Sequence, residues 1–302
     1  MRALRVVTIA MTVMGLASVA VAQRGGQRSA EERAAAERAE VEKMMAMPRP
    51  IDAVDSVWLE ELTWLEVRDA MRAGKTTIIV PTGGMEQNGT YLATGKHNYV
   101  NRAMCEAIAR KLGNALCAPN VVFVPEGSID PPSGHMHYPG SISTGEATFQ
   151  ALLTDIANSL RVTGFEHIIL LGDSGGNQRG MKEVASTLGA KWAGTKSHIH
   201  YIGEFYNDFN KVVEYIEKTY GWKQVSDGSH DDALITAILL TVDPDYARMK
   251  QRTAKGLTKT NAIELTPVTK AIEVGKAVVN RRAEITVDAI KKAIAASAAG
   301  QR

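Results

Sequence analysis

One stretch, residues 168–177, constrains the fold more than any other part of the chain. It is an apolar run that ends at Gly172 and is followed at once by Asp173 and, shortly after, by a pair of glycines. A short apolar run bounded by glycine is typical of a buried strand, and residues 178–190 then have a helical pattern. We therefore expect Asp173 at the carboxyl end of a strand, the edge where open parallel sheets bind ligands. On this stretch alone, Asp173 can also be a simple helix cap.

The rest of the chain alternates short apolar or β-branched runs with amphipathic segments. One helix is expected to start after Thr63, where Glu66 completes the spacing of a capping box. Strands are expected at residues 77–81, 121–125, 168–172 and 198–203, and further helices at 99–112, 149–160, 178–190, 207–220, 233–242, 267–279 and 287–298. This alternation predicts an α/β fold of three layers, with a mostly parallel sheet and helices on both faces. A hydrophobic content of 45% is enough for one large core, which we place in a single domain at residues 51–302.

The amino terminus has the composition of a secretory signal. Arg2 and Arg5 precede an apolar run over residues 6–21, and cleavage is expected after Ala22. A retained anchor is the alternative, but the run is too short to favour a membrane span. Residues 23–50 are predicted to form a charged helical or disordered leader. The mature protein is therefore expected to be periplasmic or secreted, with no stable membrane span.

The cysteines and the charge balance limit other functions. Cys105 and Cys117 are the two cysteines of the chain, and in an oxidising compartment they can pair, although Cys105 is equally plausible as a buried thiol in a helix. Two cysteines cannot form a structural zinc site by themselves. The net charge is +2 and no basic run is interleaved with aromatic residues, so we expect no nucleic-acid partner.

Polar side chains follow four of the expected strands and loops. Because the carboxyl ends of parallel strands meet at one edge of a sheet, these side chains can converge on one site. Carboxylate and imidazole ligands suit a divalent ion such as zinc, which activates water and polarises a carbonyl group. Each residue also has a plain structural interpretation as an ion-pair partner, an exposed loop histidine or a helix N-terminal charge. The residues are Glu86, Asn88, His97, His135, His137, Asp173, Ser174, His230, Asp231 and Asp232.

Four motifs occur in an order that resembles the creatininase (creatinine amidohydrolase) family. They are Trp-Leu-Glu-Glu-Leu-Thr-Trp at 58–64, Val-Pro-Thr-Gly-Gly-Met-Glu-Gln-Asn-Gly at 80–89, His-Met-His-Tyr-Pro-Gly-Ser-Ile-Ser at 135–143, and the segment 164–177. The resemblance implies an α/β enzyme, often a homo-oligomer, that hydrolyses small or cyclic amides with zinc or manganese. The expected reaction is cleavage of an amide C–N bond by a metal-activated water, and the substrate is a small-molecule amide.

The chain departs from the family pattern at the metal ligands. The resemblance implies Glu86, His97 and Asp173 as ligands of the first ion, but the family has an aspartate at position 97 and a histidine at position 173. The exchange keeps one glutamate, one aspartate and one imidazole. The second ion of the family loses support, because an imidazole nitrogen has one lone pair and cannot bridge two ions, and because Asn88 replaces a histidine. We expect one Zn²⁺ ion, with Mn²⁺ as the alternative.

The resemblance also suggests roles in catalysis. His230 matches a histidine that assists proton transfer in the family and is expected to be the general acid or base. Asp232, or alternatively Asp231, is expected to orient it or to replace a glutamate that this chain lacks. Residues expected to contact the substrate are Asn88, His135, His137 and Ser174.

Three other interpretations stay open. The chain can be a non-catalytic member that binds a small molecule in the periplasm, or it can catalyse a different metal-dependent reaction on the same scaffold. The Gly-Asp-Ser-Gly-Gly run at 172–176 also resembles the nucleophile turn of chymotrypsin-like proteases. Those proteases are all-β and have an Ala-Ala-His-Cys stretch that this chain lacks, which makes the third interpretation the weakest.

Overall fold

The structure is a computed structural model that describes residues 29–299. Contacts divide the chain into two units, Met1–Pro50 and Ile51–Arg302. The expected signal peptide, residues 1–22, lies outside the described residues. In the first unit, helix α1 (Ala30–Ala46) buries none of its residues, as expected for a sequence with so few large apolar side chains.

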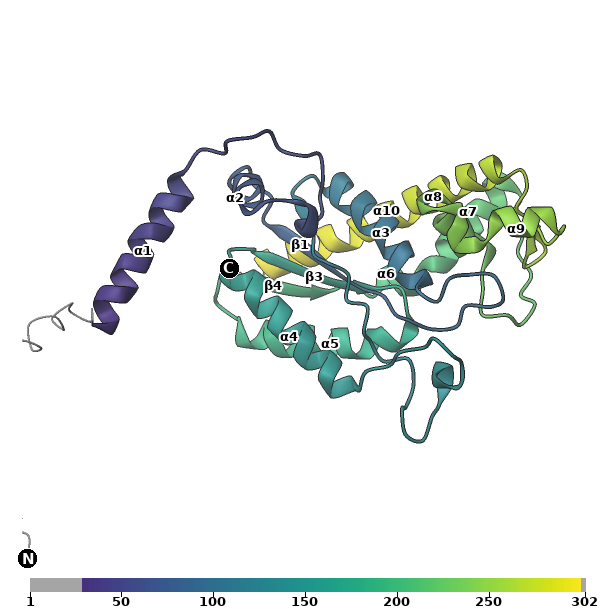
Figure 1. Ribbon diagram of the computed structural model, residues 1–302, viewed down its shortest axis with the longest axis horizontal. Coiled ribbons are helices and arrows are strands. Elements are labelled where there is room, and N and C mark those ends of the chain that lie inside the picture. Colours follow the sequence, from purple (N-terminus) through teal and green to yellow (C-terminus); the bar gives the residue numbers. More distant parts are fainter. Residues whose placement is uncertain (1–28, 300–302) are drawn as a thin grey trace, which may run out of the picture. The chain divides into compact units, whose positions relative to one another are not determined.

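A sheet of four parallel strands lies at the centre of the second unit (Figure 1). The strand order is β2-β1-β3-β4, so the chain leaves β1 toward one side of the sheet and later returns to β3 on the other side. The register pairs Thr82 with Gly172, and the two central strands therefore end together at this switch point. The strands are β1 (Thr77–Thr82), β2 (Ala115–Cys117), β3 (His167–Gly172) and β4 (His198–Tyr201).

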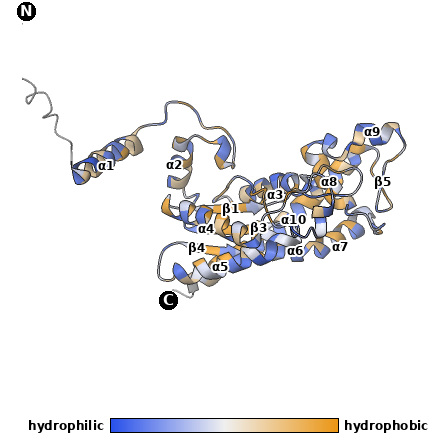
Figure 2. Ribbon diagram, turned by 60° about the horizontal axis from the view of Figure 1, so that its bottom comes forward, coloured by the Kyte–Doolittle hydropathy of each residue, from blue (hydrophilic) through white to orange (hydrophobic). Residues whose placement is uncertain are grey.

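Helices cover both faces of the sheet. Successive strand residues point to opposite faces, so Ile79 and Ile169 pack with α3, α8 and α10, whereas Ile78 and Ile168 pack with α4 and α5. Figure 2 shows the hydrophobic strands between helices with hydrophilic outer faces. This arrangement confirms the predicted α/β class with a parallel sheet. The bounds are α2 (Trp64–Arg72), α3 (Lys96–Leu112), α4 (Glu146–Val162), α5 (Gln178–Lys191), α6 (Glu204–Asn207), α7 (Phe209–Tyr220), α8 (Ala233–Val242), α9 (Met249–Ala254) and α10 (Val268–Ala299), with a small antiparallel pair, β5 (Lys259–Thr260) and β6 (Ile263–Glu264).

One predicted strand is wrong and one strand was missed. Residues 121–125 form a single bridge, between Val121 and Thr82, and then leave the sheet. Proline at positions 119 and 125 removes two of the backbone donors that a continuous ladder needs. The strand that pairs with β1 is instead β2, whose three residues are too short to show a period of two.

The two helices predicted for the tail are a single helix, α10, of 32 residues. Residues 280–286 contain neither proline nor glycine, so nothing in the backbone ends the helix there. The apolar pattern is interrupted because two polar residues, Arg282 and Thr286, are buried in the middle of this helix. No helix of the described residues is both long enough and apolar enough to span a membrane.

Cys105 of α3 and Cys117 of β2 form a disulfide, which settles a question that the sequence left open. Their Cα atoms are 6.2 Å apart, and both side chains are buried in the core. The bond ties an edge strand of the sheet to the helix that carries the first residues of the site described below.

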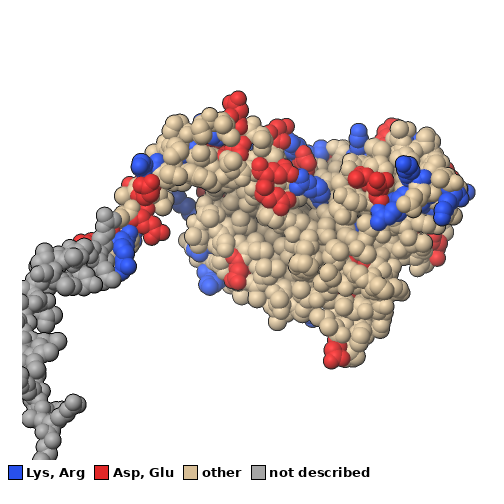
Figure 3. All heavy atoms as spheres, viewed as in Figure 1, with Lys and Arg blue, Asp and Glu red and all other residues tan. Residues whose placement is uncertain are grey.

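Acidic and basic side chains are interspersed on the face of the molecule shown in Figure 3. Exposed ion pairs of the protein include Arg102 with Glu60 at 3.4 Å and Arg110 with Asp55 at 2.9 Å. Exposed pairs of this kind contribute at most about 1 kcal/mol each, so the fold depends mainly on the two cores that flank the sheet.

Three of the seven histidines gather at the amino ends of β3 and β4. His167 pairs with His198 across the two strands, and its Nδ1 lies 3.3 Å from Nε2 of His200. Burial, together with the nearby charges of His167 and His198, lowers the pKa of His200 to about 4. The His200 ring is therefore neutral in the folded protein at neutral pH, although it would be partly protonated near pH 6 in an unfolded chain.

We expect acid to destabilise the protein through His200. Between its unfolded pKa of 6.5 and its folded pKa of about 4, the unfolded state binds more protons. Stability is therefore complete above the upper value and falls as the pH is lowered, by up to about 3 kcal/mol. The variant His200→Gln, whose side chain cannot be protonated, should lose less stability than the wild type when the pH is lowered. Urea unfolding between about pH 7 and pH 4.5 measures this, with the exposed His137→Gln as control. Equal acid sensitivity in wild type and His200→Gln would contradict the prediction.

Candidate metal centre

Side-chain hydrogen bonds connect the carboxyl ends of β1 and β3, next to the candidate site. Asn177 donates from Nδ2 to the carbonyl oxygens of Thr82 and Gly83, at 3.1 and 2.8 Å. Glu86 follows β1 and Asp173 follows β3, and both side chains are buried. The switch point of the sheet therefore presents two carboxylates on a backbone that side-chain hydrogen bonds hold in place.

The loop after Val121 forms a second wall of the site. A Cβ atom at Gly176 would lie 2.3 Å from the carbonyl oxygen of Pro125, so this close approach of two loops requires glycine. Glu126, which follows Pro125, is buried, and its carbonyl oxygen accepts a hydrogen bond from the backbone N–H of His135 at 3.1 Å. A loop that is irregular in the sequence thus brings Glu126 and His135 to the carboxyl edge of the sheet.

His97 lies between the two carboxylates. Its Nε2 is 2.7 Å from Oε1 of Glu86, and its Nδ1 is 2.7 Å from Oδ2 of Asp173. The other oxygen of Asp173 forms an ion pair with Nη1 of Arg282, at 2.7 Å. The three ligands expected from the sequence therefore converge, but as a hydrogen-bonded chain. The two nitrogens of His97 point to different carboxylates, so these side chains do not face one common point.

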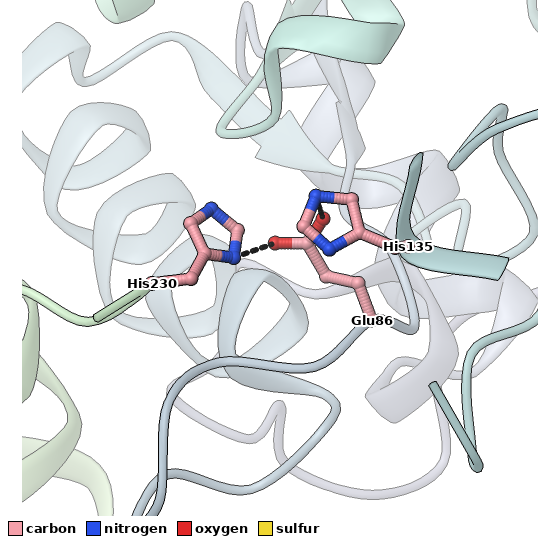
Figure 4. A group of neighbouring side chains, drawn as sticks. All are labelled: Glu86, His135 and His230. Carbon is pink, nitrogen blue, oxygen red and sulfur yellow. Dashed lines mark ion pairs between the residues drawn. The ribbon is translucent and has the colours of Figure 1, made fainter. Parts of the chain in front are cut away.

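A second group does face one point (Figure 4). Ligand atoms of Glu86, His135 and His230 all lie within 4.8 Å of one another, and this is the group of three within residues 29–299 that meets this condition. Nε2 of His135 is 3.1 Å from Glu86 Oε2, and Nδ1 of His230 is 3.6 Å from Glu86 Oε1. The same Nδ1 donates to the carbonyl oxygen of Gln87 at 2.9 Å, so the lone pair of the ring is on Nε2 and not on the nitrogen that faces Glu86. One carboxylate and two imidazoles are a ligand set that zinc and manganese accept.

The surrounding charges hold the carboxyl groups in different states. Burial opposes ionisation of Glu86, but the hydrogen bond and charge of His97 and the charge of Lys96 lower its pKa to about 2. Burial likewise opposes ionisation of Asp173, and the charges of Arg282 and His97 outweigh it, so that its pKa is also about 2. For Glu126, burial and the neighbouring Glu86 act in the same direction and raise the pKa to about 9. The site thus contains two carboxylates and one neutral carboxylic acid at neutral pH.

Two adjoining cavities, of about 460 and 420 Å³, open onto these groups. They share His97, Asp173, Tyr206 and His230, so this row of side chains separates them. Their size suits a small organic molecule. The first is also lined by Lys96, Asn207, Phe209, Asp231, Asp232, Ile235 and Arg282, and the second by Glu86, Pro125, Glu126, Gly127, His135, Ser174, Gly175 and Gly176.

The other residues expected in the site have different surroundings. Ser174 lines the second cavity. Asn88 is buried behind Glu86, where its Nδ2 donates to backbone carbonyl oxygens, including that of Glu86 at 3.0 Å. His137 is exposed on a 3₁₀ turn. Asp232 is the N-cap of α8 and accepts from the backbone N–H groups of Leu234 and Ile235. Catalytic and substrate-binding roles for these residues stay predictions.

Three buried residues of the site were missed from the sequence. Glu126 had a detectable signal, because it follows an apolar run as Asp173 does. Lys96 and Arg282 had none, since a lysine at the start of a helix and an arginine within one are usually exposed. Arg282 lies more than 100 residues from Asp173, and only the packing of α10 beneath the site reveals their ion pair.

Comparison with known proteins agrees with this geometry. The profile of the family described as creatininase, creatinine amidohydrolase, matches residues 60–298. The chain belongs to the creatininase family. This creatininase-family protein is 26% identical over 197 residues to the creatinine amidohydrolase of Pseudomonas putida, a match that covers 63% of this chain and 73% of that protein. The buried carboxylates and histidines of the site therefore lie in a protein of the creatininase family.

Solved creatininase structures have the same fold. A manganese form is 22% identical with a TM-score of 0.58, and a mutant form of zinc–zinc type is 21% identical with a TM-score of 0.57. Each match covers 79% of this chain and 98% of the other. Family membership and the group formed by Glu86, His135 and His230 together support a metal-dependent amidohydrolase that acts on a small molecule.

Proposed function

We propose that this protein hydrolyses the C–N bond of a small or cyclic amide, using one divalent ion held by Glu86, His135 and His230. The observation that carries the proposal is the convergence of these three side chains on a cavity in a chain of the creatininase family. The ligand set replaces the one that we expected from the sequence, in which His97 and Asp173 accompany Glu86. Both nitrogens of His97 already contact carboxylates, whereas His230 keeps a free lone pair.

Two buried polar atoms beside the proposed ligands lack a hydrogen-bond partner, which is consistent with a bound ion. Nδ1 of His135 and Oε1 of Glu126 are buried and have no hydrogen-bond partner in the described part of the chain. Buried polar atoms rarely lack partners unless a ligand, ion or water completes them. When bound, the ion would activate a water molecule and polarise the carbonyl group of the amide. Zinc and manganese are both compatible with one carboxylate and two imidazoles.

The remaining groups of the site orient ligands and transfer protons. His97 bridges Glu86 and Asp173 and thereby fixes the Glu86 carboxylate, as partners behind a ligand commonly do. Because His230 is a ligand in this arrangement, a different group must carry the proton from the water to the leaving nitrogen. Glu126 lies in the same cavity as Glu86 and His135, is not one of the three ligands, and is protonated at neutral pH. We assign the transfer to its carboxyl group, which donates its own proton to the leaving nitrogen and takes one from the water in exchange.

We further propose that the enzyme works outside the cytoplasm. The basic and apolar pattern of residues 1–22 supports export, and the disulfide between Cys105 and Cys117 is of a kind that persists in oxidising compartments. A homo-oligomer, expected from the family resemblance, is part of the same proposal.

Metal analysis and amide turnover test the function together. Residues 23–302, purified without chelator, should contain about one zinc or manganese ion per chain. A panel of small lactams and cyclic amides that includes creatinine should contain at least one substrate. Chelation should abolish turnover, and zinc or manganese should restore it. A protein without bound ion, or turnover that resists chelation, would contradict the proposal. Bound metal with tight binding but no turnover of any amide would favour the non-catalytic alternative.

A further inference from the structure

Lys96 is a buried cation for which the surrounding protein supplies no hydrogen-bond acceptor. It is the first residue of α3, its side chain is 8% exposed, and it lines the first cavity. Its Nζ lies 3.7 Å from Oε1 of Glu86, which is an ion pair but is too long for a hydrogen bond. Nζ makes no hydrogen bond within residues 29–299. An ammonium group has three N–H donors, and because Lys96 lines the cavity these donors are open to water or to a ligand that enters it.

The position of Lys96 does not serve the stability of its helix. The amino end of a helix carries a partial positive charge, and α3 has no acidic residue in its first turn and no side-chain cap. A lysine at this end is therefore electrostatically unfavourable for the helix. Its place is explained by the cavity, because α3 points its amino end at the carboxyl edge of the sheet, where Glu86 and Asp173 lie.

The other cation of this cavity is already occupied. Nε and Nη2 of Arg282 donate to the carbonyl oxygen of Phe205 at 3.1 and 3.0 Å, and its Nη1 forms the ion pair with Asp173. Although Nη1 makes no hydrogen bond within the described residues, it is buried against Asp173, so Lys96 is the cation whose donors are open to this cavity. Lys96 and His230 line the same cavity.

We propose that Lys96 is a catalytic residue that binds the carbonyl oxygen of the substrate amide. This inference rests on the proposed function and names a group that acts on the substrate. When the oxygen of water bonds to the carbonyl carbon, the π pair of the C=O bond moves onto the oxygen beside Nζ. The pair returns to re-form the C=O bond when the C–N bond breaks, and one proton of the water ends on the leaving nitrogen. Nζ donates a hydrogen bond throughout and balances the transient negative charge.

The geometry restricts the substrate class. Lys96 lines the first cavity, Glu86 and His135 line the second, and His230 lines both. A substrate must therefore place a carbonyl oxygen at Lys96 and its amide carbon near His230. Small neutral amides satisfy this condition.

Binding of inorganic phosphate, a tetrahedral anion, tests the role of Lys96 without a known substrate. Titration calorimetry compares the wild type with Lys96→Met, Lys96→Arg and Lys211→Met, an exposed lysine of α7, in zinc-loaded and metal-free protein. Lys96→Met should weaken phosphate binding roughly tenfold or more in both forms, and Lys96→Arg should stay within about threefold. Zinc affinity should not fall in Lys96→Met, because a neighbouring positive charge is removed and no ligand is lost. With any amide that is turned over, kcat should fall about 100-fold.

The outcomes separate this inference from the proposed function. Phosphate affinity that is unchanged in Lys96→Met, or absent in the wild type, would overturn the inference, and so would loss of zinc in Lys96→Met, since that result indicates a structural role. Zinc-dependent turnover that does not need Lys96 would keep the function and reject the inference. Binding of phosphate through Lys96 in a protein that takes up no zinc would reject the proposed function and with it the catalytic role of Lys96, and would leave Lys96 as an anion-binding residue. Lys96→Gln provides the same comparison if the methionine variant does not fold.

Discussion

Replacing His135 with alanine is expected to lower zinc affinity roughly 1000-fold and to abolish amide hydrolysis, because it removes one of three proposed ligands. Replacing His97 should cost less, about 10- to 100-fold, because His97 contacts the ligand Glu86 and not the ion. Zinc affinity is measured by competition with a chromogenic chelator, and turnover with the best amide of the panel. The difference between the two variants distinguishes the proposed ligand set of Glu86, His135 and His230 from the set expected from the sequence.

His137→Ala is the matched control, because His137 lies on the same 3₁₀ turn as His135 and is exposed. It should keep both zinc affinity and turnover. If His97→Ala loses zinc while His135→Ala retains it, Glu86, His97 and Asp173 are the ligands after all, and the chain of hydrogen bonds must rearrange when the ion binds. If all three variants bind zinc as the wild type does, the ion is held elsewhere.

The sheet could be predicted because its strands are buried on both faces. Residues 77–82 and 167–172 are nearly continuous apolar runs, and such runs have few interpretations other than parallel strands when amphipathic helices separate them. The same pattern placed Glu86 and Asp173 at the ends of neighbouring strands. β2 escaped prediction because three residues are too few for any period, and α10 because Arg282 lies buried in its middle.

The contacts among the side chains of the site could not be predicted. A sequence shows which residues can bind an ion, but not which of their atoms are already used. His97 looks like a ligand in the sequence, and its two nitrogens prove to contact Glu86 and Asp173. His135 looks like an exposed loop histidine, and a backbone hydrogen bond to Glu126 brings it against Glu86. These outcomes depend on rotamers and loop conformation, which no pattern of residue types encodes.

Arg282→Met is expected to destabilise the protein by about 3 to 5 kcal/mol, because it leaves the Asp173 carboxylate buried without its cation. Both side chains of this ion pair are 4% exposed, so water cannot replace the guanidinium. The arginine also joins α10 to the carbonyl oxygen of Phe205. Urea unfolding at neutral pH measures the loss. Arg281→Met is the matched control: this neighbour on the same helix is 40% exposed, and its loss should cost less than about 1 kcal/mol.

The pKa of Asp173 and a double variant separate the loss of the ion pair from the loss of side-chain packing in Arg282→Met. In the wild type the pKa of Asp173 is lowered from 3.8 to about 2, so its contribution to stability is complete above the upper value and is lost as the pH falls through the lower one. Without Arg282 the burial of Asp173 is opposed only by His97 and Lys96, and its pKa should rise. Adding Asp173→Asn to Arg282→Met should then recover part of the lost stability, because the uncompensated charge is gone. Equal losses in Arg281→Met and Arg282→Met, or no recovery in the double variant, would show that Asp173 does not depend on the guanidinium, and that His97 and Lys96 are enough to keep its carboxylate ionised.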